Sequence, residues 1–259
     1  MDFFVYHFQV FLLILLRMSS MMVVAPFYSS AIIPFRMKAA LAFMISIVVF
    51  PIVAQKGYTL PGDTGGYFLM ILQEIAIGIF IGFLVSIIFS AFQLAGQYFA
   101  VQIGFGINEV LDPLAQVSIP IIGQIKNLVG LLVFLSINGH HYLVEAVYRS
   151  YQLAPVFEIS RKFQEGILKY VVYSFSGMFV VAMKIALPVL SVLFLIEVSM
   201  GILAKVAPQM NIMMLGFPFK IVISFLVFMI TAPLVIRIMQ VSLERTFNFM
   251  TKVLIHWPI

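Results

Sequence analysis

The longest apolar run of the chain, residues 67–103, limits what the chain can fold into. Glu74 is the only charged residue within this run. As a single helix the run would be roughly 50 Å long, because each residue adds about 1.5 Å. The hydrocarbon core of a bilayer is only about 30 Å thick. We therefore expect a helix that bends, or a helix that extends beyond the bilayer and is covered by protein.

The composition indicates a membrane protein. Hydrophobic residues make up 63% of the chain and charged residues 10%, which is typical of a polytopic membrane protein. We predict an all-α fold of about six long, kinked, apolar helices that form helical hairpins. The predicted apolar segments are residues 3–25, 37–54, 67–103, 119–137, 171–207 and 219–238. Pro188 interrupts the fifth segment, where we expect a kink.

The chain lacks the motifs of common enzymes and binding proteins. It contains no cysteine, which excludes disulfides and thiolate metal sites, and its basic residues are scattered. It has no serine-hydrolase, zinc-protease or phosphate-loop motif. We expect an Asn-Gly turn at Asn138-Gly139, followed by the adjacent His140 and His141. The two histidines would point to different sides of a helix and chelate poorly. We predict no enzymatic activity, no cofactor, no metal and no nucleic-acid partner, which leaves a channel, a transporter or a subunit of a membrane assembly.

Three basic side chains lie well inside the predicted apolar segments, away from the segment ends, namely Arg17, Lys126 and Lys184. A charge in a bilayer is unfavourable unless it faces protein or water. Such residues either pair inside a helix bundle or line a path for a substrate, and the sequence leaves both interpretations open. Gly78 and Gly82 form a G-x-x-x-G pair, which permits the close approach of another helix.

A polar turn between the last two apolar segments predicts a helical hairpin at about residues 186–238. Glu197 and Lys205 share one helix face, so we expect them to form an ion pair within the chain or with a neighbour. The first arm should end just before Pro208, because a residue that precedes proline disfavours helix. Asn211 is a suitable cap for the second arm. The residues assigned to this hairpin are Glu197, Gly201, Lys205, Pro208, Gln209, Met210 and Asn211.

A glycine-flanked loop at about residues 102–117 follows the long apolar run. Gly104 and Gly106 flank Phe105, and Ile107 comes next. The loop is either an ordinary connection or a mobile apolar flap at the mouth of a pore.

Two amphipathic stretches lie in the second half of the chain. In residues 156–170, apolar side chains recur every three or four residues and charged side chains fill the other face. This pattern is typical of a helix that lies on a membrane or a partner. Residues 239–259 form an amphipathic tail.

Several short motifs together resemble the FliR family of flagellar type III export-gate subunits. The strongest is Ala207-Pro208-Gln209-Met210-Asn211, followed by Leu215-Gly216-Phe217-Pro218. Supporting motifs are Ile137-Asn138-Gly139-His140-His141, Gln102-Ile103-Gly104-Phe105-Gly106, and Arg17 with Ala25-Pro26-Phe27. The likeness covers essentially the whole chain, and the combination is more specific than any single motif.

The resemblance implies an architecture and a set of partners. Members of this family assemble with FliP and FliQ into a hetero-oligomeric export gate in the bacterial inner membrane, at the flagellar basal body, with FlhB at its entrance. Residues 1–152 would be the FliP-like part and residues 153–259 the FliQ-like part. The hairpin would lie at the gate entrance, and the loop at about 102–117 would be the plug that closes the idle channel. Over-long helices would then be buried in protein rather than in membrane lipid.

Three functional hypotheses follow. The first is a non-enzymatic pore subunit that conducts unfolded flagellar substrates and is required for flagellum assembly. Flexible apolar side chains such as Phe105 and Met210 would seal around an extended chain. The second is an autonomous secondary transporter or channel, in which Arg17, Lys126 and Lys184, with Glu197, line the path. The third is a purely structural scaffold.

Overall fold

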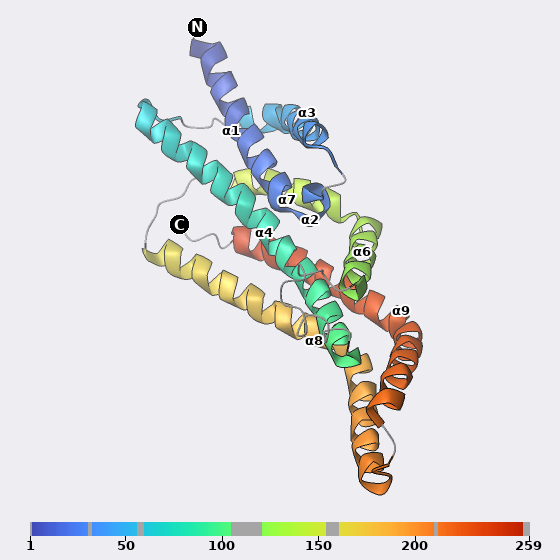
Figure 1. Cartoon of the computed structure of the whole chain (residues 1–259). Coiled ribbons are helices and arrows are strands. Elements are labelled where there is room, and N and C mark those ends of the chain that lie inside the picture. Colours follow the sequence, from blue (N-terminus) through green and yellow to red (C-terminus); the bar gives the residue numbers. More distant parts are fainter. Residues whose placement is uncertain are drawn as a thin grey trace, which may run out of the picture. The chain divides into compact units, whose positions relative to one another are not determined.

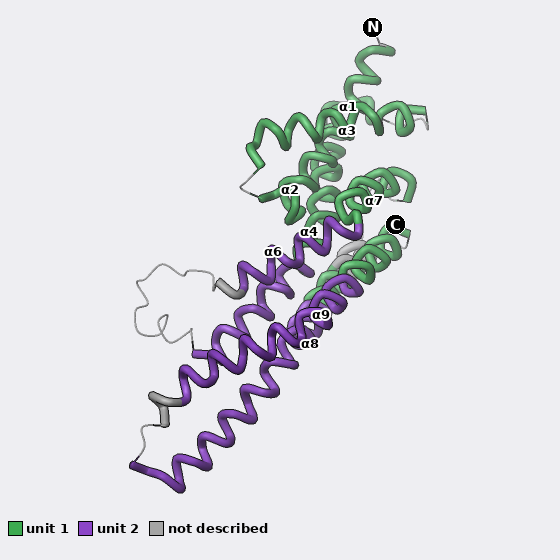
Figure 2. The backbone as a smooth tube through the Cα atoms, turned by 90° about the vertical axis from the view of Figure 1, so that its right-hand side faces the viewer, with its two compact units in different colours: residues 1–87, 138–175, 243–259 green, residues 88–137, 176–242 purple. Residues whose placement is uncertain are grey.

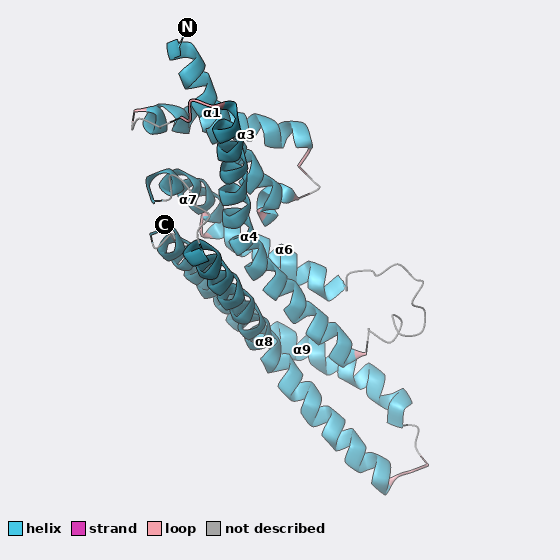
Figure 3. Ribbon diagram, turned by 90° about the vertical axis from the view of Figure 1, so that its left-hand side faces the viewer, coloured by secondary structure: helices cyan, strands magenta, loops and turns pink. Residues whose placement is uncertain are grey.

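Helices form all the regular secondary structure in the described part of the chain (Figures 1 and 3). A computed structural model describes residues 2–30, 33–55, 60–104, 121–153, 161–209 and 212–255. The helices are α1 (Asp2–Val24), α2 (Pro26–Ser29), α3 (Phe35–Ala54), α4 (Thr64–Ile103), α6 (Ile121–Ser136), α7 (Gly139–Leu153), α8 (Arg161–Val206) and α9 (Ile212–Ile255). Among them, five are long and apolar enough to cross a membrane, and the bent pair of α6 and α7 is a sixth candidate. The protein is therefore an all-α polytopic membrane protein, as predicted.

The long apolar run is a single helix, α4, of 40 residues. At about 1.5 Å per residue α4 is about 60 Å long, which is roughly twice the thickness of a hydrocarbon core. Helix α8, with 46 residues, and α9, with 44, are longer still. The expectation of over-long helices is confirmed for α4 and α8, whereas the length of α9 was not predicted.

Two stretches predicted to be separate amphipathic elements belong to longer helices. From Arg161 onward, the stretch predicted at 156–170 is the beginning of α8, and its earlier residues lie outside the described part. Residues 239–255 likewise continue α9 without a break. No proline or polar turn separates the parts, so the change in polarity marks a change of surroundings along one helix. Pro188 also lies inside α8, and the kink expected there stays a prediction.

An asparagine turn separates α6 from α7. Asn138 has a positive φ of 57°, a conformation that asparagine tolerates better than most residues. The chain bends by 66° here, and His140 and His141 fall in the first turn of α7. The predicted Asn-Gly turn is confirmed.

The chain divides into two compact units (Figure 2). Unit 1 comprises residues 1–87, 138–175 and 243–259, and unit 2 comprises residues 88–137 and 176–242. Each unit draws on both halves of the sequence. The division predicted at residue 152 separates a FliP-like part from a FliQ-like part. It concerns likeness to other proteins rather than compactness, and it stays a prediction.

In unit 1, apolar and aromatic contacts pack the short N-terminal helices and the end of α9. Phe11 of α1 meets Phe43 and Phe50 of α3 edge to face, with ring centroids 5.5 and 6.0 Å apart. Tyr142 of α7 stacks on Phe247 of α9 at 5.0 Å. These contacts join α1 to α3 and α7 to α9.

In unit 2, the second part of α4 packs against α8 and α9. The core contains five buried residues, Phe99, Ile103, Val189, Leu193 and Ile196. Residues of α9, including Ile221, Val227 and Phe228, cover this core. Within unit 2, the end of α4 therefore packs against both arms of the helical hairpin formed by α8 and α9.

Candidate functional site

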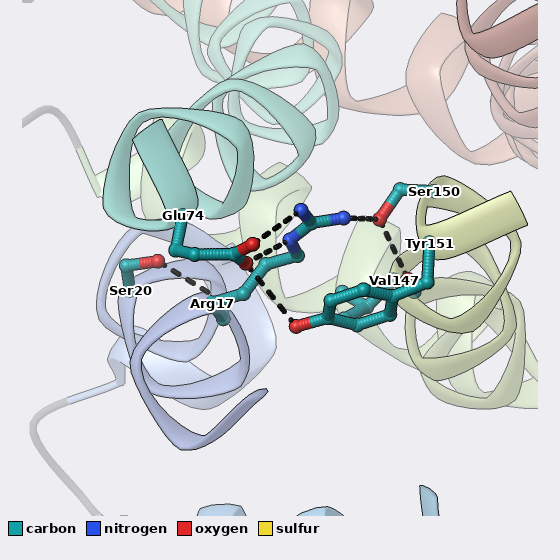
Figure 4. A network of polar contacts seen from close by, with 6 residues as sticks. All are labelled: Arg17, Ser20, Glu74, Val147, Ser150 and Tyr151. Carbon is teal, nitrogen blue, oxygen red and sulfur yellow. Dashed lines mark hydrogen bonds and ion pairs between the residues drawn. The ribbon is translucent and has the colours of Figure 1, made fainter. Parts of the chain in front are cut away.

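Unit 1 contains a buried arginine–glutamate pair (Figure 4). The Arg17 and Glu74 side chains are 0% and 2% exposed. Arg17 Nε donates to Glu74 Oε2 at 2.5 Å, and Nη2 donates to Oε1 at 2.9 Å. This parallel pair of bonds is the strongest geometry available to a guanidinium and a carboxylate. It joins α1 to α4.

Helix α7 completes the surroundings of this pair. Arg17 Nη1 donates to Ser150 Oγ at 2.7 Å, and Ser150 in turn donates to the Val147 carbonyl. The Tyr151 hydroxyl donates to Glu74 Oε2 at 3.3 Å. The Tyr151 ring lies 3.8 Å from the guanidinium carbon, which adds a cation–π contact. The network thus connects three helices that are far apart in the sequence, as Figure 4 shows.

Two glycines bring α4 close enough to α1 for this pair to form. Glu74, Gly78 and Gly82 are four residues apart on α4 and share a face. A Cβ on Gly78 would overlap the Arg17 carbonyl and the Ser20 hydroxyl, and one on Gly82 would lie 2.9 Å from the Met21 carbonyl. The G-x-x-x-G pair therefore marks a helix crossing, as its spacing suggested.

The crossing of α1 and α4 is parallel, because contacts advance together along both helices. The Tyr67 hydroxyl donates to the Gln9 carbonyl at 3.2 Å, before the Arg17–Glu74 pair. The Ser86 hydroxyl donates to the Val24 carbonyl at 2.8 Å, after it. The arginine–glutamate pair thus sets the register of a long, close helix contact.

Lys126 of α6 is buried in unit 2 without a carboxylate partner among the described residues. It is 1% exposed, and its Nζ donates to the Ala95 carbonyl of α4 at 3.2 Å. The ammonium lies 5.3 Å from the Phe99 ring and 5.6 Å from the Phe228 ring. A carbonyl and two aromatic faces therefore stabilise this charge.

The basic residues predicted to lie within the membrane have different surroundings. Arg17 and Lys126 are enclosed by the packing of the chain, whereas Lys184 is exposed on α8. Two of the three are thus satisfied by side chains, rings and backbone of the same chain. Arg17 therefore pairs inside a helix bundle, which was the first of the two interpretations. The second interpretation, in which the basic residues line a substrate path, is not favoured.

The hairpin between α8 and α9 turns where the sequence predicted. Helix α8 ends at Val206, and the Ala207 N–H donates to the Leu203 carbonyl at 2.9 Å. Pro208 and Gln209 lie in the turn. Met210 and Asn211 are outside the described residues, so the predicted cap is untested.

The charged residue of the first arm pairs across the hairpin rather than along it. Glu197 Oε1 accepts a bond from Lys220 Nζ at 2.5 Å, and Oε2 accepts one from Gln102 Nε2 at 3.0 Å. The prediction that Glu197 pairs with Lys205 within the chain is wrong, because Glu197 pairs with Lys220 and two helical turns, about 12 Å, separate it from Lys205. Pairing with a neighbouring chain stays a prediction. Lys220 lies on the antiparallel arm at the same level. Gly201 faces open space in the described structure.

Most of the predicted plug lies outside the described residues. Phe105, Gly106 and Ile107 belong to that part, and Gly104 is the last described residue before it. Gly104 has a φ of 103°, which glycine adopts without strain, and it ends α4 in a turn. Gln102, two residues earlier, is the residue through which the end of α4 reaches Glu197.

Sequence patterns missed Glu74, Ser150 and Tyr151. The spacing of Glu74 to Gly78 and Gly82 was a usable signal, since an acid on a glycine-lined face lies where another helix comes close. No local pattern pointed to Ser150 or Tyr151. Within the described residues no group of three or more acids and histidines is arranged to hold a metal ion.

Reversing the charges across the hairpin is expected to show that Glu197 pairs with Lys220. Glu197→Lys and Lys220→Glu should each destabilise the hairpin by about 0.5–1 kcal/mol, since the pair is partly exposed. The double exchange should recover most of that loss, as measured by thermal unfolding of the purified chain. Lys205→Glu is the matched control and should change little. A double exchange no better than the single changes contradicts the pairing.

The chain is similar to known proteins along nearly its whole length. The family described as "Bacterial export proteins, family 1" matches residues 8–246. A "Flagellar biosynthetic protein FliR" from Bacillus subtilis (strain 168) is 30% identical over 248 residues, which cover 95% of each chain. Proteins of the same name from Buchnera aphidicola subsp. Acyrthosiphon pisum and Escherichia coli (strain K12) are 28% and 25% identical. These two matches cover 93% and 95% of this chain and 92% of each relative.

Proposed function

Since the chain belongs to family 1 of the bacterial export proteins, we propose that it is a non-enzymatic subunit of the flagellar type III protein export gate. It would form part of the channel for unfolded flagellar substrates in the bacterial inner membrane. The observation that carries this proposal is the 95% coverage, on both chains, of the match to a flagellar biosynthetic protein. A likeness of this extent includes the long helices and the hairpin, not one shared motif.

The geometry of the chain supports a subunit rather than a self-contained transporter. Arg17 and Lys126 are each enclosed by their own unit, so they are poor candidates for a substrate path. Large apolar side chains instead lie on the outside of long helices, among them Phe194, Leu195 and Ile202 of α8. Helix α8 would be about 69 Å long, so a bilayer covers less than half of it. The remaining apolar surface needs protein partners.

The proposed partners are FliP and FliQ in the gate and FlhB at its entrance. Helices from neighbouring subunits would cover the apolar surface of α8 and α9 that lies outside the bilayer. The Glu197–Lys220 pair holds the arms of the hairpin together, which suits an element that packs among similar hairpins. We propose that the hairpin serves assembly and that the loop at about 102–117 closes the channel.

Deletion of residues 104–107 is expected to make the closed gate leak small ions. The deletion removes Gly104, Phe105, Gly106 and Ile107, and the apolar side chains of Phe105 and Ile107 would otherwise close the pore. The measurement is ion flux through the assembled gate in vesicles, with the intact chain as reference. An ion leak no larger than that of the intact gate would exclude the loop as a plug.

The decisive test of the proposed function is purification of the chain with its neighbours, followed by mass measurement. The chain should bring down FliP and FliQ in fixed ratio, and cells that lack the chain should have no flagella. The alternative, an autonomous transporter, predicts instead that the purified chain alone moves a small solute into liposomes. Transport by the lone chain together with normal flagella in its absence would overturn the proposal.

A further inference from the structure

Two basic side chains point outward from the α8–α9 pair in unit 2. Lys184 and Arg237 are both exposed, and neither forms an ion pair with a described residue. On α8, the buried residues Ala182, Ile185 and Ala186 define the packed face, and Lys184 lies on the opposite side. On α9, Val235 and Met239 are buried and Arg237 lies opposite to them.

The register of the two helices places these cations at one level. Glu197 meets Lys220 near one end of the pair. Counting along the antiparallel helices from this contact sets residue 184 beside residue 233. Arg237 lies about one helical turn, roughly 6 Å, farther along α9. The two cations therefore stand at about the same height along the pair.

Most neighbours of the two cations on their helix faces are apolar, and Gln240 on α9 is an exposed polar exception. One turn away on α8 are Val180 and Leu187, 50% and 56% exposed, and one turn away on α9 is Leu234, 50% exposed. An isolated charge among exposed apolar side chains is typical of the edge of a hydrocarbon layer. There, lysine and arginine extend their charged ends toward the headgroups.

The character of α9 changes at Arg237. From 221 to 236 the helix carries no charge, and large residues such as Met229 and Ile230 are 71% and 78% exposed. Beyond Arg237 the helix is amphipathic. Leu243 and Phe247 are buried there, while Glu244 is exposed. The first stretch suits hydrocarbon and the second does not, so the boundary lies at Arg237.

The uncharged band has a length that fits a bilayer with cations at its edges. Residues 221–236 span about 24 Å as a helix, and residues 185–196 of α8 span about 18 Å. A hydrocarbon core is about 30 Å thick. Lysine and arginine side chains that extend outward from the band make up the difference. Lys184 and Arg237 stand at one edge, and Lys220 stands at the other.

We propose that the α8–α9 pair crosses the bilayer between these two levels, and that Lys184 and Arg237 bind the phosphate groups of lipid headgroups at one edge. The exposed side chains of Lys184 and Arg237 both carry a positive charge, which complements the negative charge of phosphate. This proposal does not depend on the export function, since it concerns only where the hairpin meets lipid.

Depth measurements on the full chain test the position of the band. The chain has no cysteine, so single cysteines at Ile230, Leu234 and Val241 can each carry a nitroxide label. We expect oxygen to reach the Ile230 label best, and a water-soluble nickel complex to reach the Val241 label best. The Leu234 label should lie at intermediate depth. A shielded or water-exposed Ile230 label, or a Val241 label as deep as Ile230, would overturn the proposal.

A charge test separates phosphate binding from depth alone. The double variant Lys184→Gln/Arg237→Gln should bind phosphatidylglycerol in vesicles roughly fivefold or more weakly than the original chain. Lys169→Gln/Arg245→Gln is the matched control, because it removes one lysine from α8 and one arginine from α9 outside the band. This control should bind phosphatidylglycerol normally. Equal binding by the Lys184/Arg237 variant and the original chain, or an equal loss in the control, refutes the assignment. Neither outcome bears on the proposed export function, which co-purification with the gate subunits tests separately.

Discussion

Arg17→Met is expected to destabilise the folded chain by about 3–5 kcal/mol, because it leaves Glu74 buried and without its cation. Glu74→Met should cost a similar amount for the reciprocal reason. The free energy of unfolding in detergent micelles, followed by circular dichroism, measures the effect. The amount of intact chain recovered from membranes should fall in the same order.

Two further variants make this prediction specific to burial. The double variant Arg17→Met/Glu74→Met should be more stable than either single variant, since it leaves no unpaired charge in the core. Arg149→Met is the matched control, because Arg149 pairs with Glu145 on the surface of α7, where both side chains are about half exposed. That change should alter stability by less than about 0.5 kcal/mol. Equal losses for Arg17→Met and Arg149→Met would contradict the argument.

Gly78→Leu is expected to separate α1 from α4 and to destabilise the chain by about 3 kcal/mol or more. The new Cβ would overlap the Arg17 carbonyl, which is backbone and cannot rotate away. Moving the helices apart would also lengthen the Arg17–Glu74 contact one turn along. The same unfolding measurement applies. The double variant Gly78→Leu/Glu74→Met should lose less stability than the sum of the losses in the two single variants.

The control for this substitution is Gly177→Leu on α8. Among the described residues, no heavy atom lies within 4 Å of a Cβ built on Gly177. The change there should be neutral or slightly stabilising, because glycine inside a helix is less favourable than other residues by about 0.5–1 kcal/mol. Similar losses at positions 78 and 177 would show that helix crossing is not the cause.

Glu74 illustrates how far sequence patterns reach. Its position on the glycine-lined face of α4 follows from the four-residue spacing, which any helix fixes. Its partner does not follow, because Arg17 is 57 residues away and reaches it only through the parallel crossing of α1 and α4. Lys126 gives the same lesson, since its carbonyl partner and two aromatic rings come from two other helices.

The sequence by itself determined the all-α membrane class, the over-long helices, the turn at Pro208 and the break at Asn138. Each depends on apolar content or on the backbone preference of a few adjacent residues. Only the tertiary structure decided that Glu197 pairs with Lys220 instead of Lys205, and that Arg17 is enclosed whereas Lys184 faces outward. Helical periodicity fixes the face on which a side chain lies, but packing decides what covers that face.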